Sequence, residues 1–175
     1  SIYKNQFGEN IEALFLPGVL QNFAKIMVCS RLIGESKTIK SWLKNPNEYK
    51  NYVDKDFHLL KMELYTGKLP FWLKELDIKS FDSNVKRGVL RESELEGNLG
   101  FTGRQSINIF RTFLALHKKP NHLITMAEEE AFFINDKSKN FKEYLSKDFI
   151  SFMKKMYDYN LLQEIKECIY YYNKS

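Results

Sequence analysis

Apolar residues recur every three or four positions along most of the chain, which is the pattern of amphipathic helices. The clearest run follows Pro17, whose fixed backbone suits a first helical turn, and it ends near Gly34. Ser1–Phe15 shows the same spacing with an interruption at Gly8. We therefore expect helical structure from the first residues onward, with one strong helix before Gly34.

Helix start and stop signals recur after this helix. Ser36 suits the N-cap of a short helix that extends through Leu43. A longer helix is expected over Asn47–Tyr65, and Gly67 is suited to the left-handed position that follows it.

The last third of the chain is also predicted to be helical. Thr125 and Glu128 form the sequence of a capping box, which opens a helix through Ile134. We expect the aromatic cluster Tyr170–Tyr172 to pack against the helix before it. The other elements expected here are a loop at Asn135–Asn140, a short helix at Phe141–Leu145, a helix capped by Ser146, and a final helix opened by a second capping box, Asn160 with Gln163.

Composition favours an all-α fold. The 175 residues include 14 Phe and 10 Tyr but only 8 Gly and 4 Pro, which favours long helices over a turn-rich β fold. We expect an irregular helical bundle of about eight helices. Residues 1–135 are predicted to form one domain with an insertion between Ser36 and Glu96, and residues 136–175 a C-terminal helical extension packed on it.

Charge and cysteine content narrow the partners. The net charge is +5, but basic and acidic residues are interleaved, which is typical of solvated helix surfaces. A nucleic-acid partner is therefore not expected, and no apolar run approaches the roughly 18 residues of a membrane span. Cys29 and Cys168 lie in apolar helical runs and indicate a reducing, cytoplasmic location. Because the chain begins at Ser1 without Met, we expect a piece excised from a longer protein.

The sequence lacks the motifs of a self-contained enzyme. It has no phosphate-cradling G-x-x-x-x-G-K-[ST], no zinc spacing of Cys and His, and no G-x-S-x-G nucleophile elbow. No cysteine has a histidine beside it, and His58 is interpreted as a partly buried or surface residue. The isolated chain is therefore expected to catalyse nothing and to hold no metal or cofactor.

A helix expected over Ile78–Glu96, capped by Asp77, ends in a cluster of acids. Glu92, Glu94 and Glu96 lie in its last turns, where carboxylates oppose the helix dipole. Either they pair with nearby cations or they are solvated, and we expect solvation.

The most informative stretch is Glu96–Leu116. Gly97 and Gly100 flank a tight turn, and Thr102 or Gly103 then caps a new helix with Arg104 in its first turn. A helix N-terminus favours anions, and an arginine fork can bind phosphate oxygens, so this arrangement can contact a nucleotide held by another domain. The alternative is that Arg104 pairs with Glu94 or Glu96 across the turn.

This stretch resembles the end of the helical lid of AAA+ ATPases, in which an arginine after a G-x-x-x-R type motif touches the nucleotide. The segment GFTGRQSINIF, followed by LIT and MAEEEAFF, carries the resemblance, which is closest to PrkA-type serine protein kinases. It implies that Arg104 contacts the β- and γ-phosphates and that Gly100 and Gly103 shape its turn. The sequence departs from that pattern at Gly103, where the family has proline.

The resemblance also implies partners and cofactors. ATP and Mg²⁺ would be bound only in the intact parent, an ATPase or serine protein kinase whose upstream core packs against this chain. Self-association into a homo-oligomer stays open. The competing hypothesis is a non-catalytic helical interaction module that docks a partner through Phe71 and Trp72 or through Tyr170–Tyr172.

Overall fold

A computed structural model describes residues 2–135 and 144–174. In these ranges the chain forms nine α-helices and two short 3-10 helices, and its one β pairing is a single bridge between Phe15 and Ile124. The all-α class predicted from the sequence is confirmed. The elements in chain order are α1 (Ile2–Phe7), η1 (Glu9–Leu14), α2 (Val19–Cys29), α3 (Lys37–Trp42), η2 (Pro46–Tyr49), α4 (His58–Tyr65), α5 (Glu75–Ser80), α6 (Ser83–Glu96), α7 (Gly103–His117), α8 (Met126–Asn135) and α9 (Lys147–Lys174).

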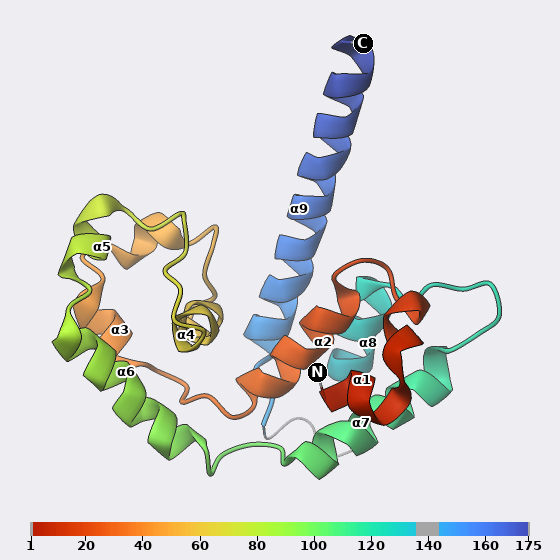
Figure 1. Ribbon diagram of the computed structural model, residues 1–175, viewed down its shortest axis with the longest axis horizontal. Helices are drawn as coiled ribbons and strands as arrows, with labels where there is room; N and C mark the ends of the chain where they lie inside the picture. Colours follow the sequence, from red (N-terminus) through yellow and green to blue (C-terminus); the bar gives the residue numbers. More distant parts are fainter. Residues whose placement is uncertain (1, 136–143, 175) are drawn as a thin grey trace.

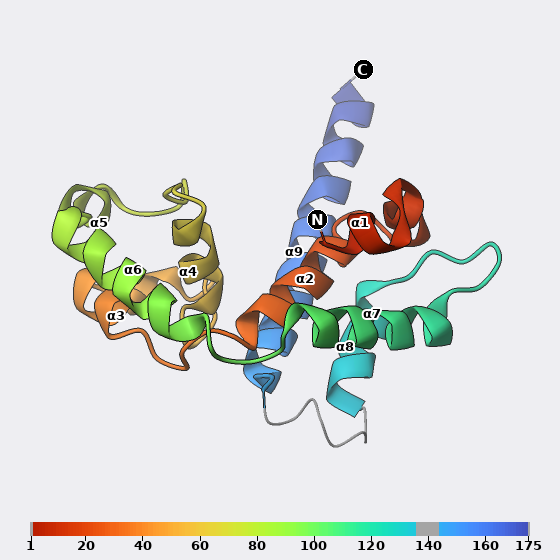
Figure 2. The same ribbon diagram turned by 60° about the horizontal axis from the view of Figure 1, so that its bottom comes forward.

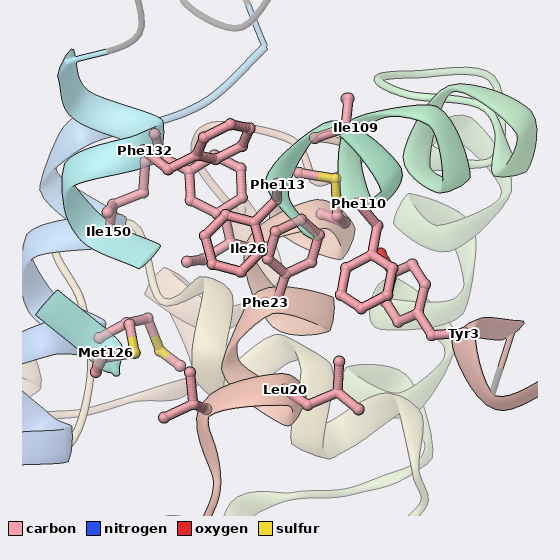
Figure 3. Packing of buried hydrophobic residues seen from close by; sticks show 14 of the residues in the cluster. Tyr3, Leu20, Phe23, Ile26, Ile109, Phe110, Phe113, Met126, Phe132 and Ile150 are labelled. Atoms are coloured by element: carbon pink, nitrogen blue, oxygen red, sulfur yellow. The ribbon is translucent and has the colours of Figure 1, made fainter. Parts of the chain in front are cut away.

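The helices gather into two lobes, which lie side by side in Figure 1. The first lobe contains α1, η1, α2, α7, α8 and the start of α9. Its core is rich in aromatic rings, and Phe23 contacts both Phe110 and Phe113 at centroid distances of 5.0 and 5.2 Å (Figure 3). Tyr3 closes this core from α1, and its hydroxyl group forms a hydrogen bond of 2.6 Å with Ser106 of α7.

The second lobe is formed by α3 to α6 around a smaller core. Its buried residues are Ile39, Trp42, Leu43, Tyr49, Val53, Leu60, Leu64, Leu73 and Val89. The α4 helix belongs to both lobes, because it presents Leu59 to the first core and Leu60 to the second. The chain thus leaves the first lobe after α2, builds the second lobe, and returns through α7.

The last helix, α9, extends far beyond both lobes. It has 28 residues, and its buried side chains, Phe149, Ile150 and Met153, all come from its first two turns. These three pack into the first core with α2 and α8. Figures 1 and 2 show the rest of α9 projecting away from the lobes. The division of the chain at residues 135 and 136 stays a prediction.

Three of the helix caps predicted from local sequence, at Ser36, Thr125 and Ser146, are confirmed. Each expected capping hydroxyl accepts a hydrogen bond from a backbone N–H of its first turn. The pairs are Ser36 with Ile39 at 3.1 Å, Thr125 with Glu128 at 3.2 Å and Ser146 with Phe149 at 3.2 Å. Gly67 has the expected positive φ of 78°.

Two predicted helices are shorter than expected. The strong helix after Pro17 ends at Cys29 rather than near Gly34. The prediction of one long helix over Asn47–Tyr65 is wrong, because only η2 and α4 form there, with Phe57 in the left-handed conformation between them. The Asp54 carboxylate accepts hydrogen bonds from the backbone N–H groups of His58 and Leu59, the first residues of α4, and so stabilises the start of this helix.

Two predicted caps are also wrong. Asp77 does not cap α6. It lies within α5, buried, and accepts hydrogen bonds from Tyr49 and from the backbone N–H of Lys44, whereas Asp82 caps α6. The second capping box at Asn160 does not start a helix, since α9 is continuous through it.

The remaining expectations for the C-terminal part have different outcomes. Tyr170–Tyr172 are exposed rather than packed on a preceding helix. The expected short helix at Phe141–Leu145 lies largely outside the described residues. No helix within residues 2–135 and 144–174 is both long and apolar enough to cross a lipid bilayer.

Candidate functional site

The turn between α6 and α7 packs directly on the end of α2. Gly100 has a positive φ of 65°, and a Cβ atom at this position would lie 2.3 Å from the carbonyl oxygen of Ser30. Glycine is therefore required here for two reasons, the backbone conformation and the close approach. The next residue, Phe101, donates its backbone N–H to the Ser30 hydroxyl at 3.2 Å.

Arg31 fixes the same turn from its other side. Its guanidinium group donates one hydrogen bond to the carbonyl oxygen of Phe101 at 3.1 Å and a second to that of Gly97. The segment that leaves α2 and the segment that enters α7 are the two chain connections between the lobes (Figures 1 and 2). The hydrogen bonds of Arg31 join these two connections. The turn is therefore part of the junction between the lobes.

The α7 helix begins with a capping box, as expected from Thr102. The Thr102 hydroxyl accepts from the Gln105 backbone N–H at 3.1 Å, and the Gln105 side chain accepts from the Thr102 N–H at 2.8 Å. Gly103 is the first helical residue. A Cβ atom added there would have Ile2 as its nearest neighbour outside the helix, at an ordinary contact distance of 3.5 Å. The structure places no special demand for glycine at position 103.

Arg104 lies on the exposed side of the first turn of α7. Among the described residues, its guanidinium group has no hydrogen-bond or ion-pair partner, and the alternative pairing with Glu94 or Glu96 does not form. The structure thus brings Gly100 and Arg104 together at one turn and leaves the arginine side chain open to solvent.

The C-terminal end of α6, just before this turn, is held by a buried ion cluster. The ammonium group of Lys61 lies 2.8 Å from the Glu92 carboxylate and is in contact with that of Glu96. Tyr65 also donates to Glu96, and the backbone N–H of Ile33 donates to it at 3.0 Å. The solvated state that we expected for these acids is wrong for two of the three.

The pKa values in this cluster follow from its hydrogen bonds. Burial acts to raise the pKa of Glu92, but hydrogen bonds from Lys61 and Ser36 outweigh it and hold the pKa below its usual value. Burial and the hydrogen bond to Glu96 raise the pKa of Tyr65. The Glu92 carboxylate is therefore ionised at neutral pH, where it pairs with Lys61.

A second buried polar pair lies between α2 and α4. The thiol group of Cys29 lies 3.2 Å from Nδ1 of His58, whose Nε2 lies 3.0 Å from the carbonyl oxygen of Ile33. A carbonyl oxygen can only accept, so Nε2 carries a proton, and in the neutral ring the thiol donates to Nδ1. Burial raises the pKa of the Cys29 thiol well above its usual range and so disfavours the thiolate, which is the form that acts as a nucleophile.

His58 corrects two expectations from the sequence. It is fully buried rather than partly buried or at the surface, and it lies beside a cysteine 29 positions earlier in the chain. Similarly, His117 and His122 both contact the carboxylate of Glu128, at 2.9 and 2.8 Å, and tie the end of α7 to α8. The one sequence signal for these contacts was the capping role of Glu128.

The described chain is thus a two-lobed helical protein with an arginine-bearing turn at the lobe junction. A family model, the PrkA serine protein kinase C-terminal domain, matches residues 59–175, which is more than half of the chain. The chain belongs to this family. The match begins in α4 and includes the α6–α7 turn and all of α9. Searches of curated proteins and of solved structures gave no match.

Proposed function

We propose that this chain is the helical lid and regulatory region of a PrkA-type serine protein kinase, in which Arg104 contacts the phosphates of a nucleotide bound by an upstream AAA+ core. The observation that carries the proposal is the exposed Arg104 side chain at the start of α7, on a turn that the rest of the fold holds firmly. The family to which the chain belongs supports a role beside a kinase core.

The local chemistry supports an anionic ligand. The capping box uses the backbone N–H groups of Thr102 and Gln105 and leaves those of Gly103 and Arg104 pointing out of the helix end. These donors, the positive end of the α7 dipole and the Arg104 guanidinium group act in the same direction. A phosphate brought to this end would meet two backbone donors and one charged fork.

The junction supports a regulatory role. Arg31 and Ser30 attach the turn to α2, and the ion cluster around Lys61 attaches α6 to α4. A displacement of the second lobe is therefore transmitted to the first turn of α7. In this proposal, contact between Arg104 and the phosphates couples the position of the lobes to the state of the nucleotide.

ATP and Mg²⁺ would be held mainly by the core, and this chain would supply one guanidinium group. Such a charge-assisted contact in a water-poor site contributes on the order of 2–4 kcal/mol to transition-state stabilisation. It positions and stabilises phosphate charge, and it supplies neither a nucleophile nor a base.

Two measurements test this proposal. The purified 175-residue chain should show no ATP turnover, and turnover from it would contradict the proposal. In the full-length protein, a non-hydrolysable ATP analogue with Mg²⁺ should slow amide hydrogen exchange at residues 99–106. Unchanged exchange there, in a protein that binds the analogue, would also contradict it.

A second candidate function is an interaction module without any nucleotide role. One observation favours it: Phe71 is 93% exposed, although a large aromatic side chain is normally buried. The sequence allowed Phe71 and Trp72 either to anchor to the core or to form a docking patch. The two side chains have different environments in the structure. Trp72 stacks on Tyr52 at a centroid distance of 5.3 Å, whereas Phe71 points into solvent. This candidate predicts that Arg104→Ala is silent and that Phe71→Ala weakens a partner complex.

A further inference from the structure

We propose that the distal half of α9, residues 159–174, pairs with the same segment of a second copy of this chain, as an antiparallel two-helix coiled coil. The inference is independent of the nucleotide role of Arg104. It rests on the exposure of apolar residues in this half, on their spacing, on the absence of charge from the stripe, and on the area that a dimer would bury.

The distal half of α9 exposes an unusual set of side chains. Figure 1 shows this part of the helix extending away from both lobes. Eight large apolar or aromatic residues here have exposed fractions between 42% for Leu161 and 82% for Tyr172. Two of them, Tyr170 and Tyr171, lie on other faces of the helix, and six form or flank one side: Tyr159, Leu161, Leu162, Ile165, Ile169 and Tyr172. A lone helix in water gains little from such residues, so another surface is expected to cover them.

Four of these residues form one continuous stripe. Leu162, Ile165, Ile169 and Tyr172 are separated by three, four and three positions, which is the a/d spacing of a coiled-coil seam. No charged residue lies in the stripe itself. Charged and polar side chains such as Glu164 and Glu167 lie on the other faces of the helix.

The stripe does not face the chain's own lobes. The side chains that anchor α9, Phe149, Ile150 and Met153, point to the first core. At about 100° per residue, the stripe is rotated by roughly 120° from these anchors. A straight α9 therefore presents its apolar stripe to an external partner.

The available area fits a modest dimer. A whole side chain of this size has about 150–200 Å² of surface, so the exposed fractions of the six residues amount to roughly 600 Å² per copy. Two copies would bury at most about 1,200 Å², if the flanking residues Tyr159 and Leu161 are covered as well, which reaches the lower end of the range for specific complexes. We expect reversible dimerisation in the micromolar range.

The charges at the base of the stripe select the antiparallel orientation. Extending the same spacing towards the lobes reaches Asp158 and Lys155. A parallel pair would place each of these residues against its own copy, with like charges opposed. In an antiparallel pair, Leu162 meets Tyr172 and Ile165 meets Ile169, and neither Asp158 nor Lys155 meets its own copy. The two pairs of lobes then lie at opposite ends.

Sedimentation velocity over a concentration series tests the pairing. The wild-type chain should pass from monomer to dimer, and Ile165→Ala with Ile169→Ala should weaken dimerisation at least tenfold. Alanine is chosen because it preserves helix propensity, which circular dichroism checks. The matched control, Gln163→Ala with Tyr170→Ala, changes the opposite face and should dimerise like the wild type. A wild-type chain that stays monomeric, or a control that loses dimerisation equally, would overturn the proposal.

Spin labels test the orientation. Cys168 is exposed, and Cys29 is buried, so Cys168→Ser leaves one protected thiol and allows a label at Lys155→Cys. In the antiparallel dimer the two labels should lie about 35 Å apart, from the 1.5 Å rise per residue. A distance near that of two adjacent helices, about 10 Å, would contradict the antiparallel arrangement.

Discussion

Arg31 donates a hydrogen bond of 3.1 Å to the carbonyl oxygen of Phe101 and so ties the end of α2 to the residue before the α7 cap. The two residues are 70 positions apart, on the two connections between the lobes. This contact makes the α6–α7 turn a fixed feature of the fold rather than a loose loop. The predictions below concern the residues that hold the turn, the core beside it, and Arg104.

Gly100→Ala should destabilise the chain by about 2–4 kcal/mol, because it adds strain at positive φ and a clash with the Ser30 backbone. Gly97→Ala is the matched control. Its φ is −56°, and the nearest atom to a new Cβ is 3.7 Å away, so the expected change is below about 1 kcal/mol. Urea unfolding measures both. Equal stability of the two variants would show that Gly100 is not packed against Ser30.

Lys61→Met should destabilise the chain by about 3–5 kcal/mol, because it leaves the buried Glu96 carboxylate and the partly buried Glu92 carboxylate without their cation. The unfolding midpoint in urea is the readout. Lys79→Met serves as the control, since Lys79 forms an exposed ion pair with Glu75 and should change little. A Lys61→Met variant as stable as the control would contradict the buried cluster.

Glu129 gives a prediction that depends on pH. Its carboxyl group is fully buried in α8, neither oxygen has a hydrogen-bond partner among the described residues, and burial raises its pKa well above the usual 4.5. The folded chain therefore holds a proton that the unfolded chain releases above about pH 4.5. Stability is lost as the pH rises from that value towards the raised pKa, by up to about 1.4 kcal/mol per pH unit.

Glu129→Met should remove this loss. The variant should be more stable than the wild type at neutral pH, by at least the roughly 1–3 kcal/mol of an unsatisfied buried polar group. The difference should grow between pH 5 and pH 8 in thermal unfolding experiments. Glu130→Gln, at the half-buried neighbouring position, is the control. A wild-type advantage that increases with pH would mean that Glu129 has a partner in the folded protein.

Local signals explain what the sequence predicted well. Ser36, Thr125 and Ser146 cap helices through contacts within three residues, which the sequence states directly. The same kind of signal failed at Asn160, because a cap sequence does not end a helix that can continue through it. The prediction of a helix over Asn47–Tyr65 failed because Phe57 adopts a left-handed conformation, which a phenylalanine in the sequence does not predict.

Contacts between distant residues were not predictable in this way. Lys61 and Glu96 are 35 positions apart, and the one local signal of their contact is a lysine among the apolar residues of the expected helix. The pair of Cys29 and His58 depends on how α2 and α4 cross, which helical spacing does not define. The candidate site was located because Gly100, Thr102 and Arg104 are close in sequence, whereas its attachment to Arg31 was not foreseen.

The most direct test of the central proposal is the activity of the full-length protein with Arg104→Ala. We expect phosphoryl transfer or ATP hydrolysis to fall by a factor of about 10² to 10³, with little change in folding stability. Arg111→Ala, an exposed change on the same helix, should leave activity near the wild-type level. If Arg104→Ala is as active as Arg111→Ala, Arg104 does not contact the nucleotide, and the interaction-module hypothesis takes its place.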